Sequence, residues 1–275
     1  CTKVCSDHLV GAINVNLQDK NLPLDFLIVG SIEEKKTLER YYDNVAIVNL
    51  IENLYSNVKT KQHTEKQTIV FGYHGSYTHL SKLSFGFVDA FKLFLDQGKD
   101  LQFHSITNET NKAFSILKQI GLPEDRIKIK EWNFDNVLSD IKEFDVGVVP
   151  NITDLSVVHP ELKQFVLADA GLYDTDYFFR LKNKSNSGRA FVLLQCGVPV
   201  ITDLTPSNMP IFFDEKAGSI ACCKKTWEKA MTRFMDHRVR NAVAKQAIQR
   251  FNSLYSMEND VTDLLNLIEN IDKNL

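Results

Sequence analysis

The hydrophobic pattern of the chain changes at Gln67. From there on, short runs of apolar and β-branched residues alternate with longer stretches in which apolar residues recur every three or four positions. The first pattern is typical of buried strands and the second of amphipathic helices, so their alternation predicts βαβ units in a parallel sheet. The predicted strands are Thr68–Phe71, Leu101–Ile106, Ile127–Lys130, Asp145–Pro150, Val198–Thr202 and Ser219–Ala221. The predicted helices are Leu80–Gln97, Thr110–Ile120, Asn136–Phe144, Ser187–Cys196, Asn208–Asp214, Lys225–Asp236, Arg238–Leu254 and Glu258–Ile271.

The part before Gln67 contains fewer elements. Its pattern predicts helices at Cys5–Gln18 and Ile32–Tyr42 and strands at Phe26–Val29 and Val45–Val48, too few for a complete Rossmann-like domain. The polar segment Ser56–Lys66 is interpreted as a linker. The fold class is therefore α/β, with a partial amino-terminal α/β segment at residues 1–60, a Rossmann-like parallel sheet domain at 67–255 and a last helix within 256–275.

Composition and charge narrow the class of protein. Charged residues make up 24% of the chain and the net charge is -3, so no basic excess predicts a nucleic-acid partner. No apolar stretch is long enough to span a bilayer, and no signal peptide is recognisable. The five irregularly spaced cysteines are interpreted as free thiols of a reducing compartment, and mostly as small core residues. Together these features predict a cytoplasmic protein.

Polar residues at the carboxyl ends of the predicted strands are the first candidates for a site, because ligands of open parallel sheets bind there. His74 and Gly75 follow the first strand of the sheet. The imidazole can donate a hydrogen bond to a phosphate or a sugar hydroxyl, and the glycine permits close approach of a ligand. The alternative is an ordinary strand-to-helix turn. Asn151 follows another strand, and Trp132 follows a third, where it either stacks on a base or packs in the core.

The segment 182–189 carries the strongest signal. It contains three cations, two amides and two serine hydroxyls directly before the apolar helix Ala190–Cys196. The N-terminus of a helix and flanking cations form an anion site, in which an arginine can bind a phosphate at two points. The predicted diphosphate ligands are Lys182, Lys184, Asn186, Ser187, Gly188 and Arg189. The alternative is a solvated basic loop with an ordinary helix cap at Ser187 or Asn186.

Other motifs are weaker. Ser207 or Asn208 caps a short helix or contacts a ligand, and the sequence does not favour either reading. Asp174 and Asp176 form a lone Asp-x-Asp pair, the histidines lack metal-ligand spacing, and we predict no metal site. Neither a nucleophile elbow nor a phosphate-binding P-loop is present.

Three segments resemble the carboxy-terminal domain of GT-B glycosyltransferases, and most of all a family-4-like group that acts in bacterial surface-polysaccharide assembly. They are Gly72-Tyr-His-Gly75, Asp145-Val-Gly-Val-Val-Pro150, and Lys184-Ser-Asn-Ser187 leading to Gln195-Cys-Gly-Val-Pro-Val-Ile201. The resemblance covers roughly residues 67–255, and the step Gly197–Ile201 is its most recognisable part.

The resemblance implies a transferase that takes a hexose-like sugar from a nucleotide-diphosphate donor without a cofactor or metal, in a retaining reaction. The acceptor is expected to be a glycan or a lipid-linked glycan, with peripheral contact at the inner membrane face. The 67–255 domain would bind the donor, with His74 next to the transferred sugar. Residues 1–60 would belong to an acceptor-side domain that is mostly missing, and the helix in 256–275 would cross back to it.

The sequence departs from the family pattern at one functional point. The family often has two acidic residues next to the donor, the second within the helix before the Gly-x-Pro-Val step, whereas Ala190–Cys196 contains no acid. Ser185, Asn186 and Ser187 lie where the first acid is expected. The resemblance then implies altered sugar recognition or lost activity, so a catalytically degenerate binding module stays open. An epimerase of the same fold also stays open, although the carboxylates it needs in both domains are not evident.

Overall fold

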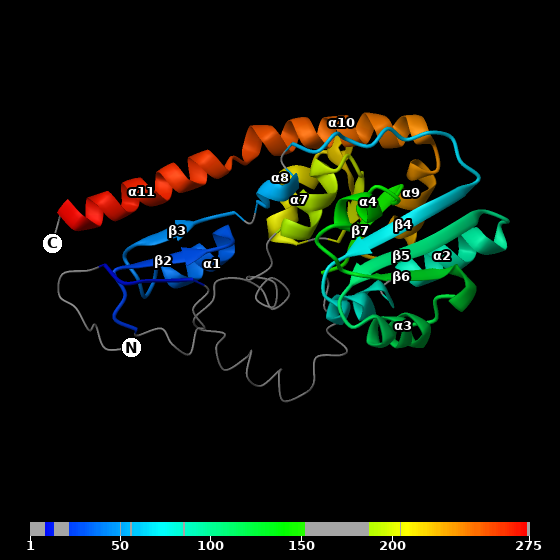
Figure 1. Ribbon diagram of the computed structural model, residues 1–275, viewed down its shortest axis with the longest axis horizontal. Coiled ribbons are helices and arrows are strands. Elements are labelled where there is room, and N and C mark those ends of the chain that lie inside the picture. Colours follow the sequence, from blue (N-terminus) through cyan, green and yellow to red (C-terminus); the bar gives the residue numbers. More distant parts are fainter. Residues whose placement is uncertain are drawn as a thin grey trace. The chain divides into compact units, whose positions relative to one another are not determined.

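The chain divides into two compact units in the computed structural model, which describes residues 9–13, 22–49, 51–55, 57–84, 86–151, 187–203 and 205–273 (Figure 1). Unit 1 comprises the described residues up to Ile51 together with those from Tyr255 onward. Unit 2 comprises the described residues from Glu52 to Asn151 and from Ser187 to Leu254.

Unit 2 is built on a six-stranded parallel sheet in the order β6-β5-β4-β7-β8-β9. Its strands are β4 (Thr68–His74), β5 (Asp100–Thr107), β6 (Ile127–Glu131), β7 (Val146–Val149), β8 (Val200–Thr202) and β9 (Ser219–Ile220). In chain order this is the 3-2-1-4-5-6 arrangement of doubly wound Rossmann-like sheets. All six predicted strands are confirmed. Strand β4 ends at His74, three residues beyond the predicted end at Phe71.

Helices cover both faces of this sheet. They are α2 (Phe87–Asp96), α3 (Thr110–Gln119), α4 (Val137–Ile141), α7 (Gly188–Gln195), α8 (Met209–Phe212), α9 (Lys224–Phe234) and α10 (His237–Leu254), with 3-10 turns η2 (Asn53–Tyr55), η3 (Tyr77–Ser84), η4 (Glu124–Arg126), η6 (Pro206–Asn208) and η7 (Glu215–Ala217). Successive strand residues alternate between the faces, so Phe71 and Tyr73 join the core under α2 and α9. Gly72 faces the other side, where an added Cβ would lie 1.9 Å from the ring of Phe144.

Two predicted helices are wrong in the described residues. The predicted helix Leu80–Gln97 is broken into η3 and α2, because Gly86 adopts a φ of 81° in the left-handed region before α2 begins. The apolar spacing continues across this break, which is why periodicity alone missed it. In the predicted helix Cys5–Gln18, Gly11–Ile13 forms strand β1, which pairs with Phe26–Ile28.

The segment interpreted as a linker is packed on unit 2. His63 is buried and lies 2.9 Å from the Gly197 carbonyl oxygen, while the Lys61 backbone N–H donates to the Cys196 carbonyl. Lys61 and Lys66 both donate to the buried carboxylate of Asp145. The segment is polar because it makes ion pairs and hydrogen bonds to the unit, and polarity alone does not distinguish this from a solvated linker.

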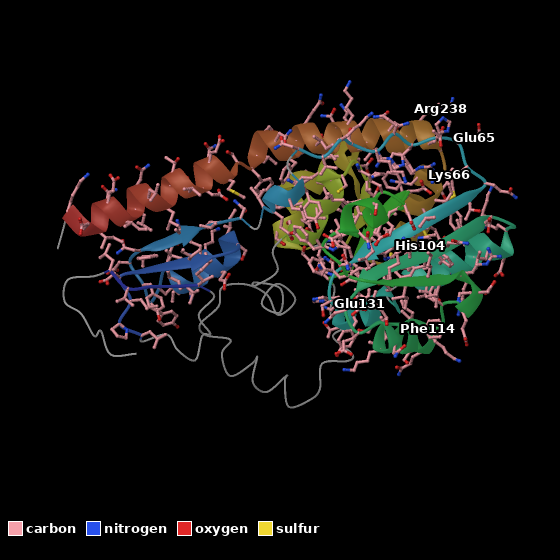
Figure 2. The ribbon with its side chains drawn as sticks, in the orientation of Figure 1. Glu65, Lys66, His104, Phe114, Glu131 and Arg238 are labelled. Atoms are coloured by element: carbon pink, nitrogen blue, oxygen red, sulfur yellow. The ribbon has the colours of Figure 1, made fainter. Side chains whose placement is uncertain are left out.

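The burial of two other kinds of residue differs from what their type suggests. Arg240, although a charged residue on a helix, is fully buried and donates to the carbonyls of Phe234, Met235 and Thr64. Nearby, Arg238 does lie exposed, with Glu65 beside it (Figure 2). Of the described cysteines, only Cys196 is buried, so core packing is wrong for Cys222 and Cys223.

Unit 1 contains a three-stranded parallel sheet in the order β1-β2-β3, with β1 (Gly11–Ile13), β2 (Phe26–Val29) and β3 (Val45–Ile47). Its core includes Leu27, Val29 and Leu38, the last from α1 (Ile32–Leu38). The long helix α11 (Met257–Lys273) lies along β3, and Asp260 accepts hydrogen bonds from the backbone and side-chain nitrogens of Asn49. Among the described helices of the chain, none is long and apolar enough to cross a membrane.

Candidate functional site

The carboxyl ends of β4 and β7 lie side by side at the centre of the unit 2 sheet. The strand order reverses between these two strands, since β5 and β6 follow β4 to one side and β8 and β9 follow β7 to the other. Loops leaving such a switch point diverge and open a crevice, which is where doubly wound sheets bind ligands. His74 ends β4 and Asn151 follows β7, so the topology alone brings both to this point.

Arg189, in the first turn of α7, joins the residues of the switch point. Its Nη1 donates to the Tyr73 hydroxyl over 3.4 Å and to the Pro150 carbonyl over 3.3 Å, and its Nη2 donates to the Asn151 side-chain oxygen. A guanidinium carries five N–H donors. Among the described residues these three acceptors leave two donors for a ligand, so the side chain is both oriented and available.

Gly75 makes room for that arginine. Its φ is 135°, and an added Cβ would lie 2.9 Å from the Arg189 Cδ and 2.9 Å from the Tyr73 hydroxyl oxygen. Tyr73 in turn donates to the Ser76 carbonyl over 2.7 Å, which fixes the loop after β4. The space beside Gly75 is thus filled by the Arg189 side chain, where the sequence predicted close approach of a ligand.

Hydrogen bonds from neighbouring elements hold Asn151 and the start of α7. The Asn151 backbone N–H donates to the Asp203 carboxylate, and the Asn151 carbonyl accepts from Lys82 over 3.3 Å. Ser187 occupies the predicted N-cap position of α7, but its hydroxyl donates to the Ser207 carbonyl instead of capping the helix. These bonds tie the ends of β7, β8 and α7 together.

The side chain of His74 is buried at this point without a hydrogen-bond partner among the described residues. It is 9% exposed, and neither ring nitrogen makes a hydrogen bond within the described part of the chain. Burial, and then the positive charge of Arg189, lowers the pKa of His74 to about 4. The imidazole is therefore neutral at pH 7, with one donor and one acceptor. A buried polar group without a partner costs free energy, which a ligand that pairs with it would recover.

The pKa of His74 makes a prediction about acid stability. Because the folded chain holds this proton more weakly than the unfolded chain, His74 lowers the free energy of unfolding as the pH falls from about 6.5 to about 4, by up to about 3 kcal/mol. His74→Phe keeps a planar aromatic side chain and removes the titration. We expect its urea midpoint to exceed that of the wild type at pH 5 by more than at pH 7.5.

His104 supplies the matched control for this measurement. It lies within the same sheet (Figure 2), and burial followed by the charge of Lys128 lowers its pKa to about 4 as well. The His74→Phe variant should therefore retain the part of the pH dependence that comes from His104. Identical pH dependence in variant and wild type would show that His74 titrates normally.

The structure brings six predicted site residues together: His74, Gly75, Asn151, Ser187, Gly188 and Arg189. Trp132 lies elsewhere on the same edge, after the outermost strand β6, two strands from β4. Its side chain is 48% exposed, so the core-packing reading of Trp132 is wrong. Lys182, Lys184 and Asn186, like the Asp174–Asp176 pair, lie outside the described residues. Asn208 precedes α8 but makes no side-chain cap, and its amide donates to Thr202.

Sequence reasoning missed three residues that build the site. Tyr73 was outside the strand predicted to end at Phe71, although its position two residues after Phe71 would have placed it on the same core face. Lys82 was assigned to a helix and Asp203 to a loop, and neither sequence position indicates contact with Asn151. Their roles depend on contacts between distant elements, 69 residues apart for Lys82 and 52 for Asp203.

No family model and no curated protein matches the chain. Solved structures do match. TarM has a TM-score of 0.60 at 13% identity over 89% of this chain. Sucrose-phosphate synthase from Thermosynechococcus elongatus matches with a TM-score of 0.60 at 14% sequence identity over 92% of this chain. Anabaena HepE, crystallised with UDP and glucose, matches with a TM-score of 0.61 at 10% identity over 90% of this chain. This chain covers 43%, 59% and 63% of their respective lengths.

These matches span both units and agree with the two parallel sheets and the 3-2-1-4-5-6 order described above. At identities of 10 to 14% they show the fold. The chain has the α/β, Rossmann-like GT-B fold of glycosyltransferases, as its resemblance implied.

Proposed function

We propose that this chain is the donor-binding part of a glycosyltransferase that moves a sugar from a nucleotide-diphosphate donor to a glycan or lipid-linked acceptor. The proposal rests on two side chains at the switch point of the sheet. Arg189 is held in place by hydrogen bonds such as that to Asn151, and the ring nitrogens of His74 have no hydrogen-bond partner among the described residues. HepE, which has this fold, was crystallised in complex with UDP and glucose and with UDP-glucose, and this supports a nucleotide sugar as the ligand class.

The chemistry of the site suits loss of a nucleoside diphosphate. As the bond between sugar and diphosphate breaks, negative charge grows on the departing phosphate oxygens. Arg189 and the positive end of α7 lie where they would stabilise that charge, in a position fixed before the reaction. Lys182 and Lys184 would add to the positive charge, with Asn186, Ser187 and Gly188 as further diphosphate contacts. This division of roles needs no resident metal, and with the family resemblance we propose a retaining reaction.

His74 would contact the transferred sugar or its phosphate as a neutral hydrogen-bonding group. Its lowered pKa keeps it uncharged at neutral pH, so it does not serve there as a protonated acid. Trp132, exposed at the end of β6, would contact the base. We assign the acceptor side to residues 1–60, donor binding to 67–255, and the crossing helix to 256–275.

Arg189→Ala should weaken binding of the matching nucleoside diphosphate by about tenfold to a hundredfold, the range expected for a lost charge-assisted contact. Arg189→Lys should restore only part of the affinity, because an ammonium lacks the two-point geometry. Titration calorimetry against UDP, GDP, ADP and CMP measures the change. Arg126→Ala is the control, since Arg126 pairs with Asp100 at the amino end of β5. Equal affinity in wild type and Arg189→Ala would exclude the arginine from the donor site.

A catalytically degenerate binding module is the second candidate, and the composition of α7 favours it. The helix runs from Gly188 to Gln195 without a carboxylate, and its side chains from Ala190 onward are buried. An epimerase of this fold is less favoured, because it needs a carboxylate that can exchange a proton with the sugar. The Asp203 carboxylate lies next to the site but already accepts a hydrogen bond from the Asn151 backbone N–H.

Turnover separates the three functions. The chain is incubated with each nucleotide sugar, with and without a mixture of glycan acceptors, and nucleoside diphosphate release and sugar identity are measured. A transferase releases nucleoside diphosphate faster with acceptor. An epimerase changes the sugar without acceptor, and a binding module binds the donor but leaves it unchanged.

A further inference from the structure

Unpartnered polar side chains gather after β8, next to the proposed donor site. Thr205 and Asn208 are fully buried, and Asn208 ends the turn η6 that follows this strand. The hydroxyl oxygens of Thr205 and Ser207 and the side-chain oxygen of Asn208 are shielded from solvent, and none of them makes a hydrogen bond within the described residues. Each buried polar atom without a partner costs free energy, which a ligand that pairs with it would recover.

Hydrogen bonds place these oxygens at the switch point of the sheet. The Ser187 hydroxyl, at the start of α7, donates to the Ser207 carbonyl. The Asn151 backbone N–H donates to the carboxylate of Asp203, which directly follows β8. Arg189, in the first turn of the same helix as Ser187, donates to the side chain of Asn151. The unpartnered oxygens therefore lie on the same edge of the sheet as Arg189, after the strand that pairs with β7.

The hydrogen-bonding character of the cluster favours a ligand with hydroxyl groups. The Asn208 amide nitrogen donates to the Thr202 hydroxyl, so the side-chain oxygen of Asn208 is left over, and this atom can only accept. The hydroxyls of Thr205 and Ser207 can both donate and accept. An ionised phosphate offers only acceptor oxygens and cannot satisfy Asn208. A sugar hydroxyl donates and accepts, and it matches all three uncharged side chains.

We propose that Thr205, Ser207 and Asn208 bind hydroxyl groups of the sugar that the donor carries. This role rests on the proposed function and divides the site by chemistry. Arg189 takes the charged diphosphate, and the neutral oxygens after β8 take the sugar. Hydroxyls of an acceptor glycan have the same chemistry, but the position of the cluster beside the start of α7 favours the donor, because its sugar is joined directly to the diphosphate.

The stability of two variants tests whether these hydroxyls are free in the fold. Thr205→Val keeps the branched shape of the side chain and removes the oxygen. Because the buried hydroxyl has no partner to lose, we expect a urea midpoint equal to or higher than that of the wild type. Ser207→Ala should behave in the same way. A lowered midpoint in either variant would show that the fold itself uses that hydroxyl, and would remove it from the sugar subsite.

The binding experiment compares each nucleoside diphosphate with its sugar conjugate, without acceptor: UDP with UDP-glucose, GDP with GDP-mannose and ADP with ADP-glucose. For the pair that binds the wild type, Thr205→Val and Ser207→Ala should each weaken binding of the sugar conjugate by about threefold to tenfold, as expected for one lost hydrogen bond. The affinity for the diphosphate alone should not change. Titration calorimetry measures both affinities on the same preparation.

Ser105→Ala is the matched control. The Ser105 hydroxyl is also buried without a hydrogen-bond partner among the described residues, but it lies within β5 and not in the loops beyond the strands. Its removal should change neither affinity.

The two ligands of each pair separate the possible outcomes. A loss confined to the sugar conjugate supports the sugar subsite. An equal loss for diphosphate and conjugate, or no loss for either, would overturn the subsite and leave the proposed donor site standing. If no diphosphate and no conjugate binds the wild type, the proposed function fails, and the subsite fails with it.

Discussion

Gly86→Ala is expected to destabilise unit 2 by about 3 kcal/mol or more. Gly86 has a φ of 81°, which disfavours any residue with a side chain by about 1 to 2 kcal/mol. The added methyl would also lie 2.4 Å from the Lys224 nitrogen and 2.7 Å from the Cys223 carbonyl carbon, which are backbone atoms at the start of α9. The α2–α9 contact must therefore open. Urea unfolding followed by fluorescence of buried Trp227, which packs on Phe87, measures the loss.

Gly98→Ala is the matched control. Gly98 has nearly the same backbone angle, a φ of 76°, but nothing lies within 4 Å of an added Cβ. Gly98→Ala should lower the free energy of unfolding only by the cost of the left-handed backbone conformation, about 1 to 2 kcal/mol. If both variants lose the same free energy of unfolding, α9 moves away from the added methyl group without destabilising the fold, and the close packing at Gly86 is unimportant for stability.

Asp145→Asn is expected to have an effect of similar size, about 3 to 5 kcal/mol, because it leaves the buried ammonium group of Lys61 without its counter-charge. The Asp145 side chain is fully buried, and it accepts from Lys61 and Lys66 over 3.0 Å each and from the Val70 backbone over 3.1 Å. Asparagine keeps the volume but not the charge. The same urea measurement applies, at a pH above the ordinary carboxyl pKa, where the unfolded-state Asp145 is also ionised.

Two further variants test the reason for that loss. Lys61→Met combined with Asp145→Asn removes the buried cation together with its partner, and should recover part of the stability lost in the single variant. Asp236→Asn breaks an exposed pair with Arg238 and should change little. A small effect of Asp145→Asn would contradict a structural role for the 57–66 segment, since these ion pairs join it to β7.

The sheet of unit 2 was predictable because its strands are short, apolar and separated by regular helices. Strands β7 and β8 are buried along their whole length and β4 along nearly all of it, and they have the near-continuous apolar sequence typical of the centre of a parallel sheet. What periodicity could not show is the break at Gly86, since the apolar positions continue on both sides of it. Strand β1 was mistaken for a helix because three residues are too few to show a period.

The candidate site was predictable in part. The rule that ligands bind beyond the carboxyl ends of strands indicated His74 and Asn151, and the cationic segment before α7 indicated Arg189; these three do come together. The rule could not indicate Tyr73 or Asp203, which position the others through contacts across the sheet. The burial of Lys61 and Arg240 was missed for a related reason, because long cationic side chains are usually exposed and only their partners show otherwise.

We propose that a nucleotide-diphosphate donor binds where β4, β7 and α7 meet. Hydrogen exchange followed by mass spectrometry, with and without each of UDP, GDP, ADP and CMP, shows whether it does. With the matching diphosphate, we predict slower exchange in the peptides that contain residues 73–77, 149–151 and 187–192, and no such change in Arg189→Ala. Protection confined to other parts of unit 2, such as the open hollow lined by Leu95, Lys99 and Arg126, would contradict the claim, as would unchanged exchange with every nucleotide.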